Sequence, residues 1–348
     1  MDIYLKSLID ERYKLSKSSM KHRRAPAQPA VIENRMLLEV SIALPARYRF
    51  DEFVHFHDRD EQQLAERVDA GARSLHKAIM WKHSPALLQL QWQSGRVQSS
   101  LHAAHAEPAE ADRAALQAMV KRMLGLIYAP GQLELAHGDH PELGALLSRQ
   151  AGLHVPGSPT PFEALTWAIT GQQITVAVAV SLRRKLIALA GEPLAQDGGM
   201  PALHAYPDAQ RVAALGLDAL RGAGFSQAKA QTLLAVAQAV AEDSLPLDDW
   251  ASRSAAGQWQ EQDVAAASAQ LLAVKGIGPW TVNYTLLRGY GWPDGSLHGD
   301  VAVRRAIGLL NGSDKPDARA ASDWLEQFKP WRALVAAHLW ASLADSAY

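Results

Sequence analysis

The sequence predicts a mainly α-helical protein with an α+β lobe at its N-terminal end. Three observations indicate this class. Apolar and polar residues alternate as in strands between about residues 36 and 101, helix signals dominate from about residue 109 onward, and no repeat of solenoid length is evident. We expect a flexible basic tail over 1–35, the α+β lobe over 36–135 and a helical domain over 136–348.

The composition restricts the chemistry. The 348 residues contain no cysteine, which excludes disulfides, thiolate zinc sites, cysteine nucleophiles and cysteine-bound iron–sulfur clusters. The net charge of −1 argues, taken alone, against a nucleic-acid partner. The first 24 residues hold seven Lys and Arg against three acids, so they form either a solvated leader or a weak electrostatic arm for DNA. No apolar run is long enough for a membrane span or a signal core, and we expect a cytoplasmic protein.

The lobe begins with strand signals. Apolar residues alternate with polar or small ones from Leu38 to Leu44 and from Leu88 to Gln93, and Ser94-Gly95 predicts a turn into a strand over 96–101. A helix follows, because Leu116, Met119, Val120, Met123 and Leu124 share one face. Two histidine pairs spaced three apart, His102/His105 and His137/His140, lack further ligands in register, so a metal site there is the weaker interpretation.

Capping residues mark the helices of the second part. Thr160-Pro161-Phe162-Glu163 predicts a helix start, and Gly171 followed by Ile174-Thr175 predicts a break and a new cap. After that cap we expect helices over 176–190, 211–220, 226–241 and 263–274, with a Gly- and Pro-rich gap between 191 and 207.

The most informative stretch runs from Leu271 to Tyr284. A helix ends near Val274, Gly276 and Gly278 predict a tight hairpin that allows positive φ, and Pro279 stands where a second helix begins. Free N–H groups of Ile277 and Gly278 at that helix end would form an anion site. The alternative is an ordinary glycine-capped turn.

The residues downstream favour the anion site. A Gly- and Pro-rich loop, Gly289 to Gly295, leads to His298-Gly299-Asp300, and Asp300 opens a helix 22 residues after Gly278. This order of hairpin, loop and aspartate resembles the helix-hairpin-helix superfamily of base-excision DNA glycosylases, and within it the 3-methyladenine DNA glycosylase II (alkylpurine) family. Three further stretches are similar to that family: 162–173, 280–289 and 329–340.

The resemblance covers about residues 158–348 and implies both fold and activity. It implies a helix-hairpin-helix glycosylase fold of two helical subdomains with an N-terminal α+β lobe. It also implies a monomeric, monofunctional DNA glycosylase of base excision repair that flips alkylated purines out of damaged double-stranded DNA. A glycosylase for deaminated purines such as hypoxanthine, and a DNA-binding protein without activity, remain the alternatives.

Asp300 is the candidate catalytic residue. Cleavage of an N-glycosidic bond passes through an oxocarbenium-like sugar, which a carboxylate at a helix N-terminus stabilises while it orients water. A plain N-cap role is the structural alternative for Asp300, and Asp294 is the rival carboxylate in the same loop.

Trp280 and Tyr284 share one helix face, and the resemblance places Trp340 with them in a base pocket. An aromatic pocket attracts cationic alkylpurines by cation–π contact, although aromatic pairs at this spacing are also common in cores. The resemblance assigns Gln173 to the wedge position, where a family member has an apolar residue, and an exposed polar role is equally open. DNA contacts are expected at Gly276, Ile277, Gly278, Thr281 and Arg304, with Arg305 as a further candidate.

The resemblance further implies that carbonyl groups of the hairpin hold Na⁺ or K⁺; the residues concerned are Leu272, Val274 and Ile277. It implies no catalytic cofactor. Bifunctional relatives carry a lysine nucleophile where this chain has Trp280, so we expect no Schiff base and no strand nicking. The lack of cysteine sets aside the branches that carry an iron–sulfur cluster.

Overall fold

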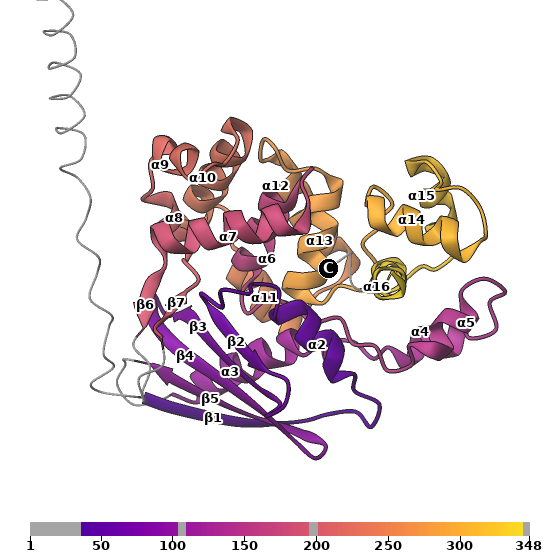
Figure 1. Cartoon of the computed structure of the whole chain (residues 1–348), viewed down its shortest axis with the longest axis horizontal. Helices are drawn as coiled ribbons and strands as arrows, with labels where there is room; N and C mark the ends of the chain where they lie inside the picture. The colour runs from indigo at the N-terminus through magenta and orange to yellow at the C-terminus, as the bar shows by residue number, and fades with distance from the viewer. Residues whose placement is uncertain (1–35, 104–108, 195–200, 344–348) are drawn as a thin grey trace, which may run out of the picture.

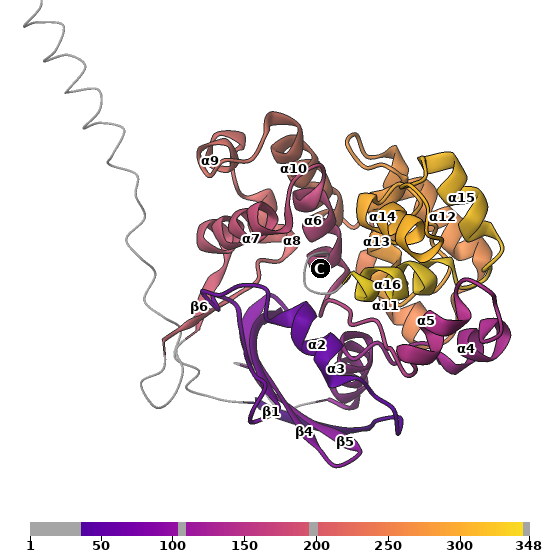
Figure 2. The same ribbon diagram turned by 45° about the vertical axis from the view of Figure 1, so that its right-hand side comes forward.

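The computed structural model describes residues 36–103, 109–194 and 201–343 (Figure 1). The expected basic tail over 1–35 and His105 lie outside these residues. The mainly helical class with an N-terminal sheet is confirmed, and the sheet lies at one end of the molecule below the helices in both views (Figures 1 and 2).

The N-terminal lobe is a five-stranded antiparallel sheet in the order β1-β5-β4-β3-β2. The strands are β1 (Met36–Ala43), β2 (Glu66–Asp69), β3 (Ser74–Trp81), β4 (Ser84–Gln93) and β5 (Arg96–Ala103). Alternation along β1 buries Leu38 and Ile42 against α2 (Phe50–His57) and α3 (Glu110–Met123). These two helices cover the concave face of the sheet (Figure 2). The expected strands and the helix over 116–124 are thus present.

The helical part contains two apolar clusters. The first gathers α6 (Pro161–Gly171), α7 (Val176–Ala190), α8 (Ala209–Ala213), α9 (Leu217–Gly222), α10 (Gln227–Ala241), α11 (Leu247–Ala255) and α12 (Glu261–Ala273). The second gathers α4 (Gly131–His137), α5 (Gly144–Arg149), α14 (Val301–Leu310), α15 (Ala318–Glu326) and α16 (Arg332–Ser342). The helix α13 (Pro279–Tyr290) packs in both clusters, with Leu286 in the first and Leu287 in the second. These are the two expected helical subdomains.

The predicted boundary between residues 135 and 136 falls inside α4. Leu133 of α4 is buried among the C-terminal helices rather than against the sheet. The packing therefore favours a division just before Gly131, and the exact domain limits stay a prediction.

Capping explains where the helices around the site begin. Thr160 accepts a hydrogen bond from the amide of Glu163, and Thr175 does the same for Val178, as expected for α6 and α7. The expected single helix over 211–220 is wrong in detail, because the chain turns near Gly216 and forms α8 and α9 separately. The expected gap over 191–207 contains a short antiparallel pair, β6 (Glu192–Leu194) and β7 (Leu203–Ala205), which packs on Ala78 of β3.

Within the described ranges, no helix is both long and apolar enough to cross a bilayer. No cluster of three or more potential metal-binding side chains occurs there either. His137 and His140, both half-buried, pack edge-on against Phe328.

Candidate active site

The hairpin between α12 and α13 is tight because of one glycine. Gly276 has a left-handed φ of 95°, and a Cβ there would stand 2.0 Å from the Oγ1 of Thr232 on α10. Gly278 differs from our expectation. It is the extended N-cap residue of α13 with a φ of −112°, and a Cβ on it would meet open space.

The amides of the hairpin also differ in part from the expectation. The N–H of Ile277 donates to the Val274 carbonyl at 3.1 Å, so it is not a free donor, and its side chain is buried in the first cluster. The amides of Gly278, Trp280 and Thr281 belong to the first turn of α13, where a helix leaves N–H groups without intrahelical acceptors. The predicted anion site can therefore begin only at Gly278 and not at Ile277. The ion-binding role of the Leu272, Val274 and Ile277 carbonyls stays a prediction.

The residue that follows α6 ties this hairpin to the loop between α6 and α7. Gln172 Nε2 donates to the Gly276 carbonyl at 3.0 Å and to the Thr281 Oγ1 at 2.8 Å. The Thr281 side chain is buried, so any contact of Thr281 with DNA would use its main chain. Our reading of the sequence gave Gln172 no role, although it lies within the Gly-Gln-Gln stretch.

Gln173 follows in a strained conformation. Its φ is 56°, which is unusual for a residue other than glycine, and its side chain is exposed. It lies at the cavity described below. Strained backbone of this kind concentrates at functional sites.

Asp300 is held by three helices. As N-cap of α14, its Oδ1 accepts the amides of Ala302 at 2.8 Å and Val303 at 3.0 Å. Its Oδ2 accepts the indole N–H of Trp280 on α13 at 2.8 Å, and Trp340 on α16 reaches Oδ1 at 3.3 Å. An N-cap role alone accounts for the first two bonds and leaves the two indole donors unexplained.

Asp294, the rival carboxylate, is occupied elsewhere. Arg332 grips it in a bidentate ion pair, with Nε to Oδ1 and Nη2 to Oδ2 both at 2.9 Å. Asp294 is not among the described residues that line the cavity. The geometry therefore favours Asp300 over Asp294 as the reactive carboxylate.

Aromatic rings and Asp300 share one open cavity of about 980 Å³. The rings of Trp280 and Tyr284 lie 5.2 Å apart between centroids, and Tyr284 lies 6.1 Å from Trp340. The lining residues that the sequence did not indicate include Trp167 of α6 and Arg59 from the N-terminal lobe. Arg304 follows Asp300 by one helical turn but is not among the described lining residues, and Arg305 is exposed.

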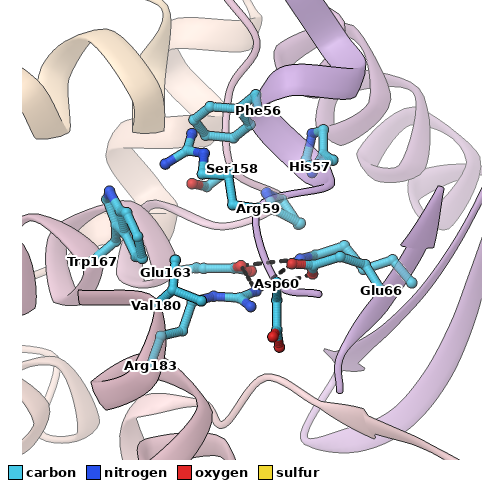
Figure 3. A pocket seen from close by; sticks show the side chains of 12 residues that line it. Phe56, His57, Arg59, Asp60, Glu66, Ser158, Glu163, Trp167, Val180 and Arg183 are labelled. Atoms are coloured by element: carbon cyan, nitrogen blue, oxygen red, sulfur yellow. Dashed lines mark hydrogen bonds and ion pairs between the residues drawn. The ribbon is translucent and has the colours of Figure 1, made fainter. Parts of the chain in front are cut away.

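Charged residues join the lobe to the helices beside this cavity. Glu66 and Lys77 of the lobe face Glu163 and Arg183 of the helical part around a small cavity of about 40 Å³ (Figure 3). Lys77 contacts the carboxylates of Glu66 and Glu163. Arg183 lies 2.9 Å from an oxygen of each of the same two carboxylates. Burial alone would raise the pKa of the Glu66 carboxyl, but Arg183 and Lys77 hold it well below its usual range.

Both the sequence and the fold of this chain are similar to those of known proteins. Residues 166–330 match the family described as HhH-GPD superfamily base excision DNA repair protein. The chain is 32% identical over 198 residues to a protein of Escherichia coli named DNA-3-methyladenine glycosylase 2, covering 57% of this chain and 63% of that one. It is 29% identical over 226 residues to a Mycobacterium tuberculosis protein named probable bifunctional transcriptional activator/DNA repair enzyme AlkA, covering 65% of this chain.

The matched regions span 42% of the Mycobacterium tuberculosis protein and 63% of the Escherichia coli protein. Both shares are less than two thirds of the relative's length. Among solved structures, that of a 3-methyladenine DNA-glycosylase from Archaeoglobus fulgidus superposes with a TM-score of 0.70. It covers 89% of this chain and all of the other at 20% identity, so it supports the fold. The family region includes the hairpin and Asp300, whereas Arg59 and Trp340 lie outside it.

Proposed function

We propose that the chain, whose residues 166–330 match the HhH-GPD superfamily of base excision DNA repair proteins, is a DNA glycosylase acting on damaged purines. The name of the Escherichia coli relative points to 3-methyladenine, and the proposal extends to other alkylated purines such as 7-methylguanine. The observation that carries the proposal is that three helices bind the carboxylate of Asp300. This carboxylate caps the N-terminus of α14, accepts hydrogen bonds from indoles of two other helices, and lies in the wall of an aromatic cavity.

The reaction follows from this arrangement. The damaged nucleotide leaves the duplex and its base enters the cavity that Trp280, Tyr284 and Trp340 line. The bond between the sugar C1′ and the base nitrogen breaks, and its electron pair goes to the base. Asp300 stabilises the oxocarbenium-like sugar, and Oδ2, which accepts only the Trp280 N–H among the described residues, takes a hydrogen bond from the incoming water.

A cationic alkylpurine needs no general acid, because it departs as a neutral molecule. No lysine occurs among the described residues that line the cavity, and Trp280 occupies the start of α13. The lining therefore supports a hydrolase that leaves an abasic site, rather than a lyase that forms a Schiff base.

We propose that DNA binds through the first turn of α13 and the exposed Gln173, with Gln173 filling the gap left by the flipped base. Backbone amides at a helix N-terminus contact phosphate without adding side-chain charge. A protein with a net charge of −1 is therefore compatible with salt-sensitive DNA binding.

The proposal is tested with duplexes that carry one 7-methylguanine, one hypoxanthine or no lesion. Each is incubated with the full chain in single turnover, and alkali is then added to cut abasic sites. We expect cleavage only after alkali and only at a lesion. Release of no base from either lesion would overturn the enzyme in favour of a DNA-binding protein, and cleavage without alkali would overturn the monofunctional mechanism.

A further inference from the structure

Arg59 reaches the base cavity from the N-terminal lobe. It lies in the segment between α2 and β2, and it lines both the large cavity beside Asp300 and the small one at the lobe interface (Figure 3). Its guanidinium carbon stands 4.1 Å from the ring centroid of Phe56 and 5.1 Å from that of Trp167. The side chain therefore runs between two aromatic rings rather than into solvent.

The neighbouring residue fixes the position of Arg59. Asp60 is buried, accepts the Gln62 amide at 3.1 Å and receives Arg184 Nε of α7 at 2.7 Å. The ion pairs of Glu66 and Lys77 with Glu163 and Arg183 hold the same lobe against the helices. Arg59 is thus presented to the cavity by an anchored segment.

Arg59 brings a positive charge to the base pocket. Its Nε is buried and has no hydrogen-bond partner among the residues that the structure describes. Burial lowers the pKa of the guanidinium, and a contact with the Tyr284 hydroxyl opposes that shift. Tyr284 in turn stacks on Trp280, which donates to Asp300, so the cation joins the same set of contacts as the reactive carboxylate.

We propose that Arg59 determines specificity by donating to a neutral 6-oxopurine, such as hypoxanthine, held in the aromatic cavity. This inference rests on the proposed glycosylase function and assigns a substrate class to the same pocket. A purine carbonyl or ring nitrogen is an acceptor of the kind that a guanidinium binds. A cationic alkylpurine carries a positive charge, as Arg59 does, and is therefore repelled by it.

The two substrate classes differ in the charge of the leaving base. When the C1′–N9 bond of a cationic alkylpurine breaks, the electron pair neutralises the base. When the same bond of a neutral purine breaks, the base leaves as an anion spread over its ring nitrogens and O6. The Arg59 cation stabilises that anion, Asp300 stabilises the sugar, and the proton lost by the attacking water finally neutralises the base.

The test compares two lesions within each enzyme preparation. Single-turnover rates are measured for hypoxanthine and 7-methylguanine with wild type, Arg59→Gln, Arg59→Lys and Arg253→Gln. Because both rates come from one preparation, their ratio does not depend on the fraction of folded protein. Arg253→Gln is the matched control, since it removes an arginine of α11 that pairs with Asp263 and is not among the described lining residues.

For Arg59→Gln we expect the hypoxanthine rate to fall at least about tenfold, in line with the loss of a charged donor to a developing anion, and the 7-methylguanine rate to rise. Arg59→Lys should recover part of the hypoxanthine rate, because it keeps the charge without the planar fork. Arg253→Gln should keep the wild-type ratio.

Three results overturn the inference. They are an unchanged ratio in Arg59→Gln, the same change of ratio in Arg253→Gln, or a wild type that releases 7-methylguanine and no hypoxanthine. The last result leaves the glycosylase function intact. Release of neither base by the wild type overturns the proposed function itself.

Discussion

The indole N–H of Trp280 donates to the Oδ2 of Asp300 at 2.8 Å, linking the start of α13 to the start of α14. The same indole ring packs 5.2 Å from Tyr284 in the cavity wall. One side chain thus contributes to the aromatic surface and positions the carboxylate.

This relationship predicts the effect of Trp280→Phe, which keeps an aromatic ring and removes the donor. Hydrogen bonds to charged groups contribute about 1.5–3 kcal/mol, so base release in single turnover should fall about ten- to a hundredfold. Trp324→Phe is the matched control, because it removes an indole bond to Glu142 away from the cavity. Equal rates for wild type and Trp280→Phe would show that the bond has no part in the reaction.

Gln172→Ala should loosen the hairpin. It removes two side-chain hydrogen bonds, to Gly276 and Thr281, each contributing about 1 kcal/mol to stability. We expect a free energy of unfolding lower by about 1–2 kcal/mol and weaker binding to an abasic duplex, measured by urea unfolding and fluorescence anisotropy. Gln231→Ala, at an exposed position of α10, should change neither quantity. Unaltered DNA affinity in Gln172→Ala would contradict the positioning role.

Gln173→Gly separates strain from function. Glycine adopts the observed φ of 56° without steric cost, so the melting temperature should not fall. The gap left by the flipped base would no longer be filled, and release should drop at least about tenfold because unstacking costs a few kcal/mol. Gln173→Asn, which tolerates the same backbone and keeps the amide, should retain more activity. A Gln173→Gly variant with the full rate would exclude a wedge at this position.

His338 predicts a pH dependence of stability. It is buried on α16, its Nδ1 lies 2.8 Å from Gln150 Oε1, and burial lowers its pKa to about 3. An unfolded histidine has a pKa of about 6.5, so the unfolded state binds the extra proton as the pH falls below that value. The contribution is complete above about pH 6.5 and is lost on acidification by up to about 1.4 kcal/mol per pH unit.

Urea unfolding between about pH 7.5 and pH 5 measures this slope. In His338→Gln the free energy of unfolding should depend less steeply on pH, by the amount that one bound proton contributes to the slope. This holds whatever the stability of the variant at neutral pH. His55→Gln, which removes an exposed histidine, is the control. Parallel curves for wild type and His338→Gln would contradict the assignment.

The sequence predicted those elements whose signals are local. Thr160, Thr175 and Asp300 cap their helices as expected, because the capping bonds join residues two or three apart. The hairpin of β4 and β5 follows from alternation around a Ser-Gly turn in the same way.

The strand β3 was missed because its alternation contains a lysine at a buried position. Lys77 lies in the core of the molecule, and its charge is balanced by Glu66 and by Glu163, which is 86 residues away. No local pattern indicates such a partner.

The residues of the candidate site also divide into those that the sequence predicted and those that it did not. Asp300, Trp280, Tyr284 and Trp340 were expected together, and the structure brings them around one cavity. Arg59 and Trp167 were missed because their place depends on how the lobe docks on α6. The expectation that Ile277 offers a free amide was wrong, because the tight turn closes a hydrogen bond to Val274.

The most direct test of the central claim is the rate of base release by Asp300→Asn, measured in single turnover on a lesion duplex followed by alkali. Asparagine is also a good N-cap, so the variant should fold, bind the duplex and lose only the charge. We predict a rate about a hundred- to a thousandfold below wild type, while Asp294→Asn, which breaks the ion pair with Arg332, keeps its rate. Release by Asp300→Asn at the wild-type rate would contradict the assignment of Asp300 as the catalytic carboxylate.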